Sequence, residues 1–227
     1  MSKIKTAFFC SNCGYESTKW VGKCPSCNQW NTFIEELIDK GTEKNNNTWK
    51  DYSDKKSSKA TALSEVSSKE EIRIITKDTE LNRVLGGGIV PGSIILLAGE
   101  PGIGKSTLLL QDVLELDELV ILYISGEESE QQIKMRADRL NKNSDKFYLL
   151  TETVTNTIFQ EIKKLKPDLV IVDSIQTLQT SFIESSPGSV SQIRECAAEL
   201  QRFAKETNTP VFLVGHITKD GSIAGPK

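Results

Sequence analysis

Gly99-Glu100-Pro101-Gly102-Ile103-Gly104-Lys105-Ser106 matches the pattern G-x-x-x-x-G-K-[ST] at every fixed position. The match follows an apolar run, Ile94–Ala98, and precedes a predicted helix that begins near Thr107. Its glycines let backbone N–H groups converge on phosphate oxygens, and the helix N-terminus adds partial positive charge. Chance matches to the bare pattern occur, but the flanking strand and helix favour a phosphate-binding loop here.

The ligand of such a loop is a nucleoside triphosphate, and we expect ATP with Mg²⁺. Lys105 is expected to neutralise the β- and γ-phosphates, and the Ser106 hydroxyl is expected to hold the magnesium ion. The predicted nucleotide-binding residues are Gly99, Glu100, Pro101, Gly102, Ile103, Gly104, Lys105, Ser106 and Thr107.

Apolar runs and helical spacing alternate from Ile72 onward. The near-continuous apolar runs are Ile94–Ala98, Leu119–Ile124, Leu169–Val172 and Val211–Val214. Runs of this kind are typical of parallel strands that are covered on both faces. The clearest helix is Ser191–Glu206, in which apolar residues recur at helical spacing. We therefore expect an α/β fold, with a parallel sheet flanked by helices and right-handed crossovers.

Acidic residues follow two of the predicted strands. Asp173 ends the run from Leu169, at the carboxyl edge where α/β sheets bind ligands, and it is expected to act on magnesium. Glu127 follows the strand that ends near Ile124 and could orient or deprotonate an attacking water. Glu128 is the competing candidate, and either acid could instead favour the N-terminus of a helix that starts near Ser129.

His216 is the only histidine in the chain. A lone histidine is commonly structural, but this one ends the apolar run Val211–Val214 at the same predicted edge as Lys105 and Asp173. We expect it to contact the γ-phosphate and to pass the presence of phosphate to the loop that follows.

The cysteines form a second chemical feature. Cys10 and Cys13 form one C-x-x-C pair, and Cys24 and Cys27 form another after a gap of ten residues. Two such pairs can surround one tetrahedral zinc ion, and because all four positions are filled by protein the site is structural rather than catalytic. Cys196 stands alone and is interpreted as a small buried apolar residue.

Composition sets the remaining limits. The net charge of -3 argues against a uniformly basic nucleic-acid binder but leaves room for a local positive strip. No apolar run approaches the roughly 20 residues that span a bilayer, and the first residues lack a signal-peptide apolar region, so the cytoplasm is expected. The predicted domains are a zinc ribbon at 1–38, a flexible polar linker at 39–70 and an ATPase core at 71–227.

Several longer strings resemble the bacterial RadA (Sms) family of DNA-recombination proteins. The string Lys19–Cys27 with Trp30-Asn31-Thr32 is similar to the zinc finger of that family. The string Glu80–Ser93, which contains Gly86-Gly87-Gly88, is similar to its lead-in to the phosphate loop. Further similar strings are Gly126-Glu127-Glu128-Ser129, Asp173-Ser174-Ile175-Gln176-Thr177, Ser185–Val190 and Gly215–Gly221.

The resemblance implies a RecA-like, DNA-stimulated ATPase that takes part in DNA repair and promotes branch migration of recombination intermediates. It also implies a homo-oligomeric ring, a hexamer at full length, with single-stranded or branched DNA and possible recombinases as partners. Glu127 would be the catalytic glutamate and His216 the γ-phosphate sensor. Lys219 and Lys227 would be candidates for DNA contact, and Gln179–Ser189 would match the region of another DNA-contacting loop.

The chain departs from the family pattern at its end. Lys227 lies a few residues beyond the sensor strand, whereas the family continues with further strands, a Lys-Asn-Arg-Phe-Gly motif and a Lon-protease-like domain. The expectation is a truncated form that retains zinc and nucleotide binding and has one open sheet edge.

Two other classes of function stay open at this point. A KaiC-like signalling ATPase would share the glycine lead-in and the phosphate loop but would not need the zinc finger. A non-catalytic fragment would use the ribbon to bind a partner, with nucleotide only stabilising the fold. A measurement of ATP turnover with and without single-stranded DNA distinguishes the three classes. DNA-stimulated turnover indicates the repair ATPase, unstimulated turnover the signalling ATPase, and no turnover the non-catalytic fragment.

Overall fold

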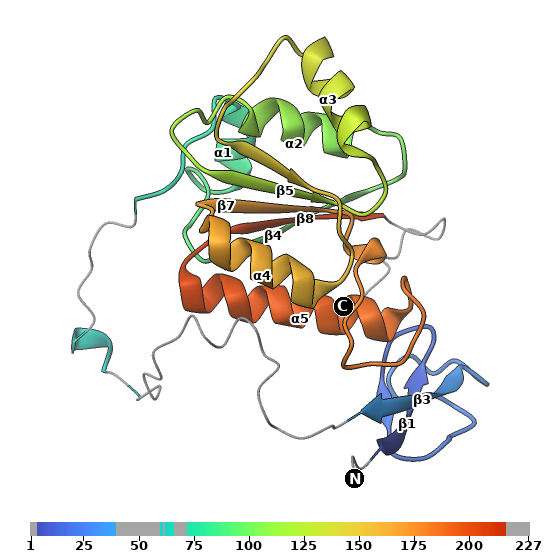
Figure 1. Cartoon of the computed structure of the whole chain (residues 1–227). Helices are drawn as coiled ribbons and strands as arrows, with labels where there is room; N and C mark the ends of the chain where they lie inside the picture. Colours follow the sequence, from blue (N-terminus) through green and yellow to red (C-terminus); the bar gives the residue numbers. More distant parts are fainter. Residues whose placement is uncertain (1–3, 40–59, 61, 66–71, 217–227) are drawn as a thin grey trace.

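A five-stranded parallel sheet forms the centre of the fold (Figure 1). The computed structural model describes residues 4–39, 60, 62–65 and 72–216. The strand order is β4-β8-β7-β5-β6, and every neighbouring pair is parallel. The strands are β4 (Ile94–Gly99), β5 (Ile121–Ser125), β6 (Phe147–Leu150), β7 (Leu169–Asp173) and β8 (Val211–His216).

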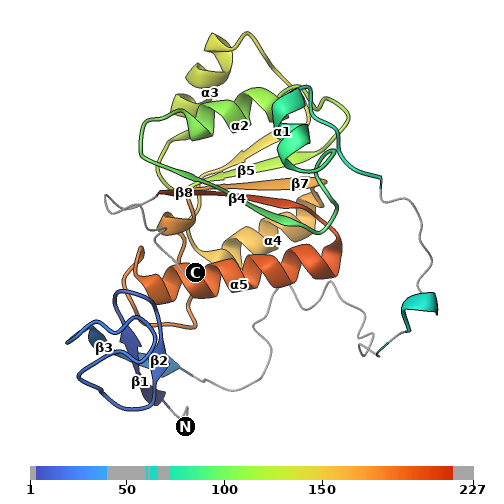
Figure 2. The same ribbon diagram turned by 180° about the vertical axis from the view of Figure 1, so that it is seen from behind.

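Helices cover both faces of this sheet, as Figures 1 and 2 show. One face carries α4 and α5, and the opposite face carries α1, α2 and α3. The helices are α1 (Thr79–Val84), α2 (Lys105–Val113), α3 (Glu130–Arg139), α4 (Thr155–Leu165) and α5 (Val190–Thr207), with 3-10 turns η2 (Leu63–Glu65) and η3 (Ile175–Thr177). No helix within the described ranges is long and apolar enough to cross a membrane.

The two covered faces explain the apolar composition of the central strands. In β7, Val170 and Val172 pack into the cluster under α4 and α5, whereas Leu169 and Ile171 pack on the α2 side. Alternation along a strand therefore delivers apolar side chains to both clusters instead of to one. Each fully buried aliphatic side chain stabilises the fold by about 1.5–3 kcal/mol relative to an exposed one.

The strands and the long helix predicted from the sequence are confirmed, with small shifts at their ends. The predicted helix Ser191–Glu206 is α5, which is capped by the Ser189 side chain and is one residue longer at each end. Cys196 is fully buried on α5, as expected, and burial raises its thiol pKa. The strand β6 was not predicted from the sequence; it lies at the edge of the sheet, has four residues and is only partly buried.

The amino-terminal module is a small antiparallel sheet of order β2-β1-β3. Its strands are β1 (Ile4–Cys10), β2 (Glu16–Ser17) and β3 (Phe33–Asp39). The four thiol sulfurs, of Cys10, Cys13, Cys24 and Cys27, lie within 4.8 Å of one another. Each C-x-x-C pair is closed by a backbone hydrogen bond, from Gly14 N to Cys10 O at 2.7 Å and from Asn28 N to Cys24 O at 2.9 Å. The thiol cluster therefore has the donor set and compactness of a four-cysteine zinc site.

This zinc ribbon lies beside the first turns of α5 (Figures 1 and 2). Arg194 on α5 donates a hydrogen bond to the carbonyl oxygen of Gly14 at 2.8 Å. A Cβ atom at Gly14 would lie 2.8 Å from Cγ1 of Val190, and the φ angle of Gly14 is +72°. Both the contact with α5 and the left-handed backbone therefore require glycine at this position.

The predicted linker at 39–70 falls mostly outside the described residues. Only 39, 60 and 62–65 of that range are described, and the last three form η2. The domain boundaries at 38 and 70 therefore stay predictions.

We predict that the chain binds one zinc ion and that a strong chelator unfolds the ribbon while the parallel sheet stays folded. In small zinc-finger peptides, zinc binding contributes about 10–16 kcal/mol to the free energy of folding. We expect the small antiparallel sheet to be unstable without this contribution. Metal analysis and limited proteolysis before and after chelation measure both effects. Cys13→Ser should lose zinc and Cys196→Ala should keep it. Purified protein without stoichiometric zinc would contradict the prediction.

We also predict a stability change at the buried carboxyl of Glu199, whose pKa burial raises to about 7 from an ordinary 4.5. Its Oε1 accepts a hydrogen bond from Thr180 at 3.4 Å, and the interactions with Thr155 and Thr180 offset only part of the effect of burial. The folded state holds this proton more tightly than the unfolded state. Stability is therefore lost as pH rises from about 4.5 to about 7, and the full cost persists above that range.

Glu199→Gln cannot ionise, so it should stabilise the protein at pH 8, by on the order of 3 kcal/mol, and change little at pH 4. Thermal unfolding at several pH values measures this difference. Glu206→Gln, which changes an exposed carboxyl at the end of the same helix, is the control. Parallel stability curves for wild type and Glu199→Gln would rule out ionisation of this group as the cause.

Candidate active site

The predicted phosphate loop joins β4 to α2 as expected. β4 ends at Gly99, α2 begins at Lys105, and the helix opens with a hydrogen bond from Leu108 N to Gly104 O at 2.8 Å. Gly102 and Gly104 have φ angles of +80° and +99°, and a Cβ atom at either position would meet nothing within 4 Å. The backbone conformation, rather than a lack of space, therefore requires glycine at these two positions.

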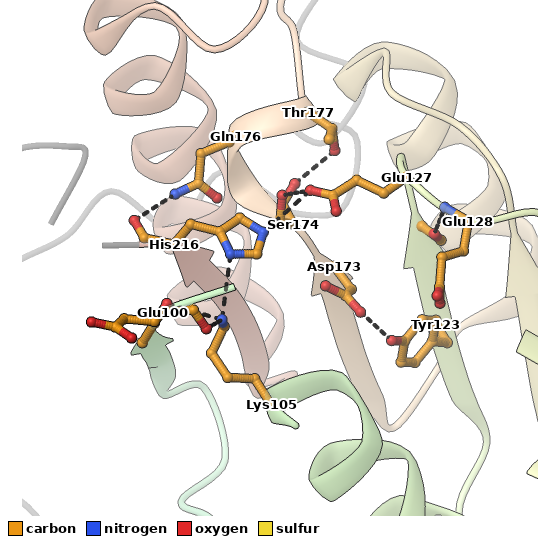
Figure 3. Close-up of polar contacts among 12 residues, drawn as sticks. Glu100, Lys105, Tyr123, Glu127, Glu128, Asp173, Ser174, Gln176, Thr177 and His216 are labelled. Atoms are coloured by element: carbon orange, nitrogen blue, oxygen red, sulfur yellow. Dashed lines mark hydrogen bonds and ion pairs between the residues drawn. The ribbon is translucent and has the colours of Figure 1, made fainter. Parts of the chain in front are cut away.

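Lys105 is almost fully buried, and its ammonium group is turned onto the loop itself. The Nζ atom donates to the carbonyl oxygens of Gly99 at 2.9 Å and Glu100 at 2.8 Å. Its third contact is Nδ1 of His216, at 3.3 Å (Figure 3). The ammonium group is thus held in the middle of the loop by three acceptors.

His216 connects Lys105 to Glu127. The register pairs Gly99 with His216, which brings the ring beside the loop. Because an ammonium group only donates, Nδ1 is the acceptor, and in a neutral ring the proton is then on Nε2. Nε2 lies 3.4 Å from Oε1 of Glu127 and is placed to donate to it. The three residues therefore form one polar chain from the phosphate loop to the end of β5.

The two neighbouring acids have different surroundings. Glu127 lies over the sheet edge, where its Oε1 accepts from the Ser174 hydroxyl at 2.7 Å. Glu128 points to α3, where it forms an ion pair with Arg136, and its backbone N–H donates to the Ser125 hydroxyl at 2.9 Å. The geometry favours Glu127 over Glu128 as the acid that faces the phosphate loop, and it gives Glu128 a structural partner.

Asp173 ends β7 between these groups and is buried. Its Oδ2 accepts a hydrogen bond from the Tyr123 hydroxyl at 2.5 Å (Figure 3). Burial, followed by the charge of Asp173, raises the pKa of Tyr123 well above its usual range, so the phenol stays a donor. The hydroxyl of Ser106 and the carboxylate of Asp173 are the oxygen donors that magnesium prefers, and this donor set fits the ion.

The turn η3 holds the strand ends in place. The Thr177 hydroxyl donates to Ser174 O at 2.7 Å, and the Gln176 amide donates to His216 O at 3.3 Å. A Cβ atom at Gly126 would overlap Oγ1 of Thr177, so only glycine lets the end of β5 lie this close to η3. The backbone N–H of Gly126 also donates to Asp173 O at 3.1 Å.

No site role was predicted from the sequence for Tyr123, Ser174, Gln176 or Thr177. The last three belong to a string quoted only for its resemblance to a family. Tyr123 carried one signal, since it is the polar-tipped residue in an otherwise aliphatic run. Lys219 and Lys227, the candidate DNA contacts, lie outside the described residues.

The other candidate DNA loop, Gln179–Ser189, is described and is held against α5. The Gln192 side chain donates to the carbonyl oxygens of Thr180, Ile183 and Ser185, at 3.2, 2.8 and 3.1 Å. Its own amide oxygen accepts from Thr180 N at 2.8 Å. One buried side chain therefore fixes the path of the first half of this loop.

Two family models match the chain, and they cover both modules. A model described as an AAA domain matches residues 60–222, and one described as a rubredoxin metal binding domain matches residues 8–35. Among solved structures, a KaiC-like protein of Pyrococcus horikoshii OT3 aligns with a TM-score of 0.54 at 18% identity, over 66% of this chain and 73% of that one. A DnaB-like replicative helicase aligns with a TM-score of 0.55 at 17% identity, over 66% and 44%. At these identities the likeness shows the RecA-like fold alone.

Curated relatives are much more similar in sequence. The DNA repair protein RadA of Bacillus subtilis (strain 168) is 50% identical over all of this chain and 50% of its own length. RadA of Halalkalibacterium halodurans is 52% identical with the same coverage, and RadA of Haemophilus influenzae is 47% identical over 98% of this chain and 49% of its own.

The chain thus spans about half the length of the curated relatives that it matches. The AAA model covers most of its residues, and the ribbon model covers the four clustered cysteines. The chain belongs to the AAA domain family and, within that family, to the RadA proteins of bacteria.

Proposed function

We propose that this chain binds magnesium–ATP at the loop between β4 and α2, hydrolyses it, and serves DNA repair. The observation that carries the proposal is the polar chain at the carboxyl edge of the sheet, from Lys105 through His216 to Glu127. The basic group comes from the start of α2, the acidic groups from the ends of β5 and β7, and the imidazole from the end of β8. Phosphoryl transfer to water needs this set of groups, because its catalysis rests on positioning and electrostatic stabilisation.

Binding is the first task of these residues. Loop N–H groups and the N-terminus of α2 favour the phosphates, and Lys105 neutralises the charge on the β- and γ-phosphates. Ser106 and Asp173 would hold magnesium, which when bound neutralises charge on the phosphate oxygens. The loop residues from Gly99 to Thr107 form the proposed nucleotide-binding set.

Glu127 is the proposed catalytic acid-base group. A carboxylate in this position can orient a water molecule for attack on the γ-phosphate and accept its proton. The hydroxyl of Ser174 fixes one of its oxygens, which limits rotation of the side chain. His216, in contact with both Lys105 and Glu127, is the proposed sensor. When a bound phosphate draws the Lys105 ammonium group away, Nδ1 of His216 loses its hydrogen-bond donor.

The DNA-dependent part of the proposal draws on the relatives, whose printed name is DNA repair protein RadA. We propose DNA-stimulated hydrolysis and branch migration by a ring, a hexamer at full length, on single-stranded or branched DNA, with a recombinase as a possible partner. Lys219, Lys227 and the loop Gln179–Ser189 are the proposed DNA contacts. ATP turnover measured with and without single-stranded DNA tests this against a signalling ATPase and a non-catalytic ribbon fragment.

We predict that Lys105→Ala weakens ATP binding by about ten- to a hundredfold, which is the usual value of hydrogen bonds to a charged group. Equilibrium binding of a fluorescent ATP analogue measures the loss. Lys134→Ala, which removes an exposed lysine on α3 that pairs with Asp138, is the matched control. Zinc content should not change in either variant. Wild-type affinity in Lys105→Ala would show that the loop does not bind phosphate.

We predict that Glu127→Gln retains magnesium–ATP binding but loses about a hundred- to ten-thousandfold in turnover, because the amide cannot accept a proton. Glu128→Gln is the matched control, since Glu128 pairs with Arg136, and it should lower stability while sparing turnover. Steady-state hydrolysis with and without single-stranded DNA, together with thermal melts, measures both variants. An inactive Glu128→Gln beside an active Glu127→Gln would reverse the assignment.

A further inference from the structure

Tyr123 and Asp173 share the face of the sheet that α2 covers. The register pairs Tyr123 with Ile171 and Ser125 with Asp173, so Tyr123 is a diagonal neighbour of Asp173 across β5 and β7. Side chains two residues apart on a strand lie on one face, and Ile171 packs in the α2-side cluster with Tyr123. Aromatic side chains are long enough to reach a diagonal neighbour. Asp173 therefore continues the α2 face of β7, and Tyr123 extends toward it under the strand ends.

The contact between them is buried and has a fixed direction. Tyr123 is fully buried and Asp173 is 8% exposed. A carboxylate oxygen accepts and a hydroxyl donates, so the Tyr123 hydrogen lies toward Oδ2. Figure 3 shows the other carboxylate oxygen turned away from Tyr123, toward the side of the site where Lys105 lies. The Tyr123 hydroxyl thus holds one carboxylate oxygen of Asp173, and the other oxygen faces the site.

We propose that Tyr123 is a positioning residue for magnesium, one that acts by fixing the rotation of the Asp173 carboxylate. This inference rests on the proposed function, because it assumes that Asp173 binds magnesium together with the nucleotide. The hydroxyl holds one oxygen of Asp173, so the other stays aimed at the ion instead of rotating between orientations. Residues behind a metal ligand commonly have this role.

The ring of Tyr123 has a separate structural role that phenylalanine preserves. The ring packs in the α2-side cluster, and its centroid lies 5.8 Å from that of Phe147. Tyr123→Phe keeps this packing and removes only the donor to Asp173. The variant therefore tests the hydroxyl without opening a cavity in the core.

The experiment measures binding of a fluorescent N-methylanthraniloyl derivative of ATP, first in EDTA and then across a magnesium chloride titration. In Tyr123→Phe we expect an unchanged dissociation constant in EDTA and a half-saturating magnesium concentration raised about tenfold or more. Tyr148→Phe removes a hydroxyl from β6, where the side chain is half exposed, and should match wild type in both measurements.

A double-variant cycle separates positioning from a general structural effect. If the hydroxyl acts through the carboxylate, Tyr123→Phe should have little further effect on the magnesium titration in an Asp173→Asn background. Additive effects in that cycle would overturn the inference, and so would a wild-type magnesium titration in Tyr123→Phe. A wild-type chain whose affinity is the same in EDTA and in magnesium would overturn the proposed magnesium site as well.

Discussion

The parallel register of the sheet brings the groups of the candidate site together. Gly99 lies beside His216 and Ser125 beside Asp173, so the carboxyl ends of β4, β8, β7 and β5 meet at one edge. β5, β7 and β8 consist of buried residues up to or near their ends, whereas β4 is only partly buried, and hydrophobic burial on both faces fixes the register of the central strands. A shift of one residue would turn Asp173 to the α4–α5 face, away from Tyr123. The packing of the core thus determines which polar groups can meet.

Much of this arrangement could be predicted from the sequence because it follows from local patterns. The glycines and Lys105 specify the loop, the apolar runs specify the strands, and the chain direction of parallel strands brings Asp173 and His216 to one edge. In the same way, the two C-x-x-C pairs specify the four-cysteine zinc site. What the sequence left open was the choice between Glu127 and Glu128, because adjacent residues share every local signal. The family resemblance favoured Glu127, and the tertiary partners, Ser174 of Glu127 and Arg136 of Glu128, give the two acids different surroundings.

The contacts of the ribbon and the loop with α5 could not be predicted from local patterns, since they join parts of the chain far apart in sequence. Arg194 and Gly14 are 180 positions apart, and Gln192 holds a loop whose path has no repeating pattern. These two α5 residues are two positions apart, about 200° around the helix, so they serve opposite sides of it. The first turns of α5 thus lie between the ribbon and the loop that leads from the candidate site.

The hydrogen bonds of Lys105 have a consequence for the choice of ligand. Its ammonium group already has two carbonyl acceptors and an imidazole acceptor within the protein. A ligand that binds Lys105 must therefore replace some of these internal hydrogen bonds. The binding free energy that Lys105 contributes is only the difference between the new and the old interactions. A neutral nucleoside offers the amine nothing better than a carbonyl oxygen, whereas a di- or triphosphate offers full negative charge. Under the proposed function, the hydrogen bonds that Lys105 already makes within the protein would make affinity depend steeply on the charge of the phosphate chain, and they would discriminate against nucleosides and free bases.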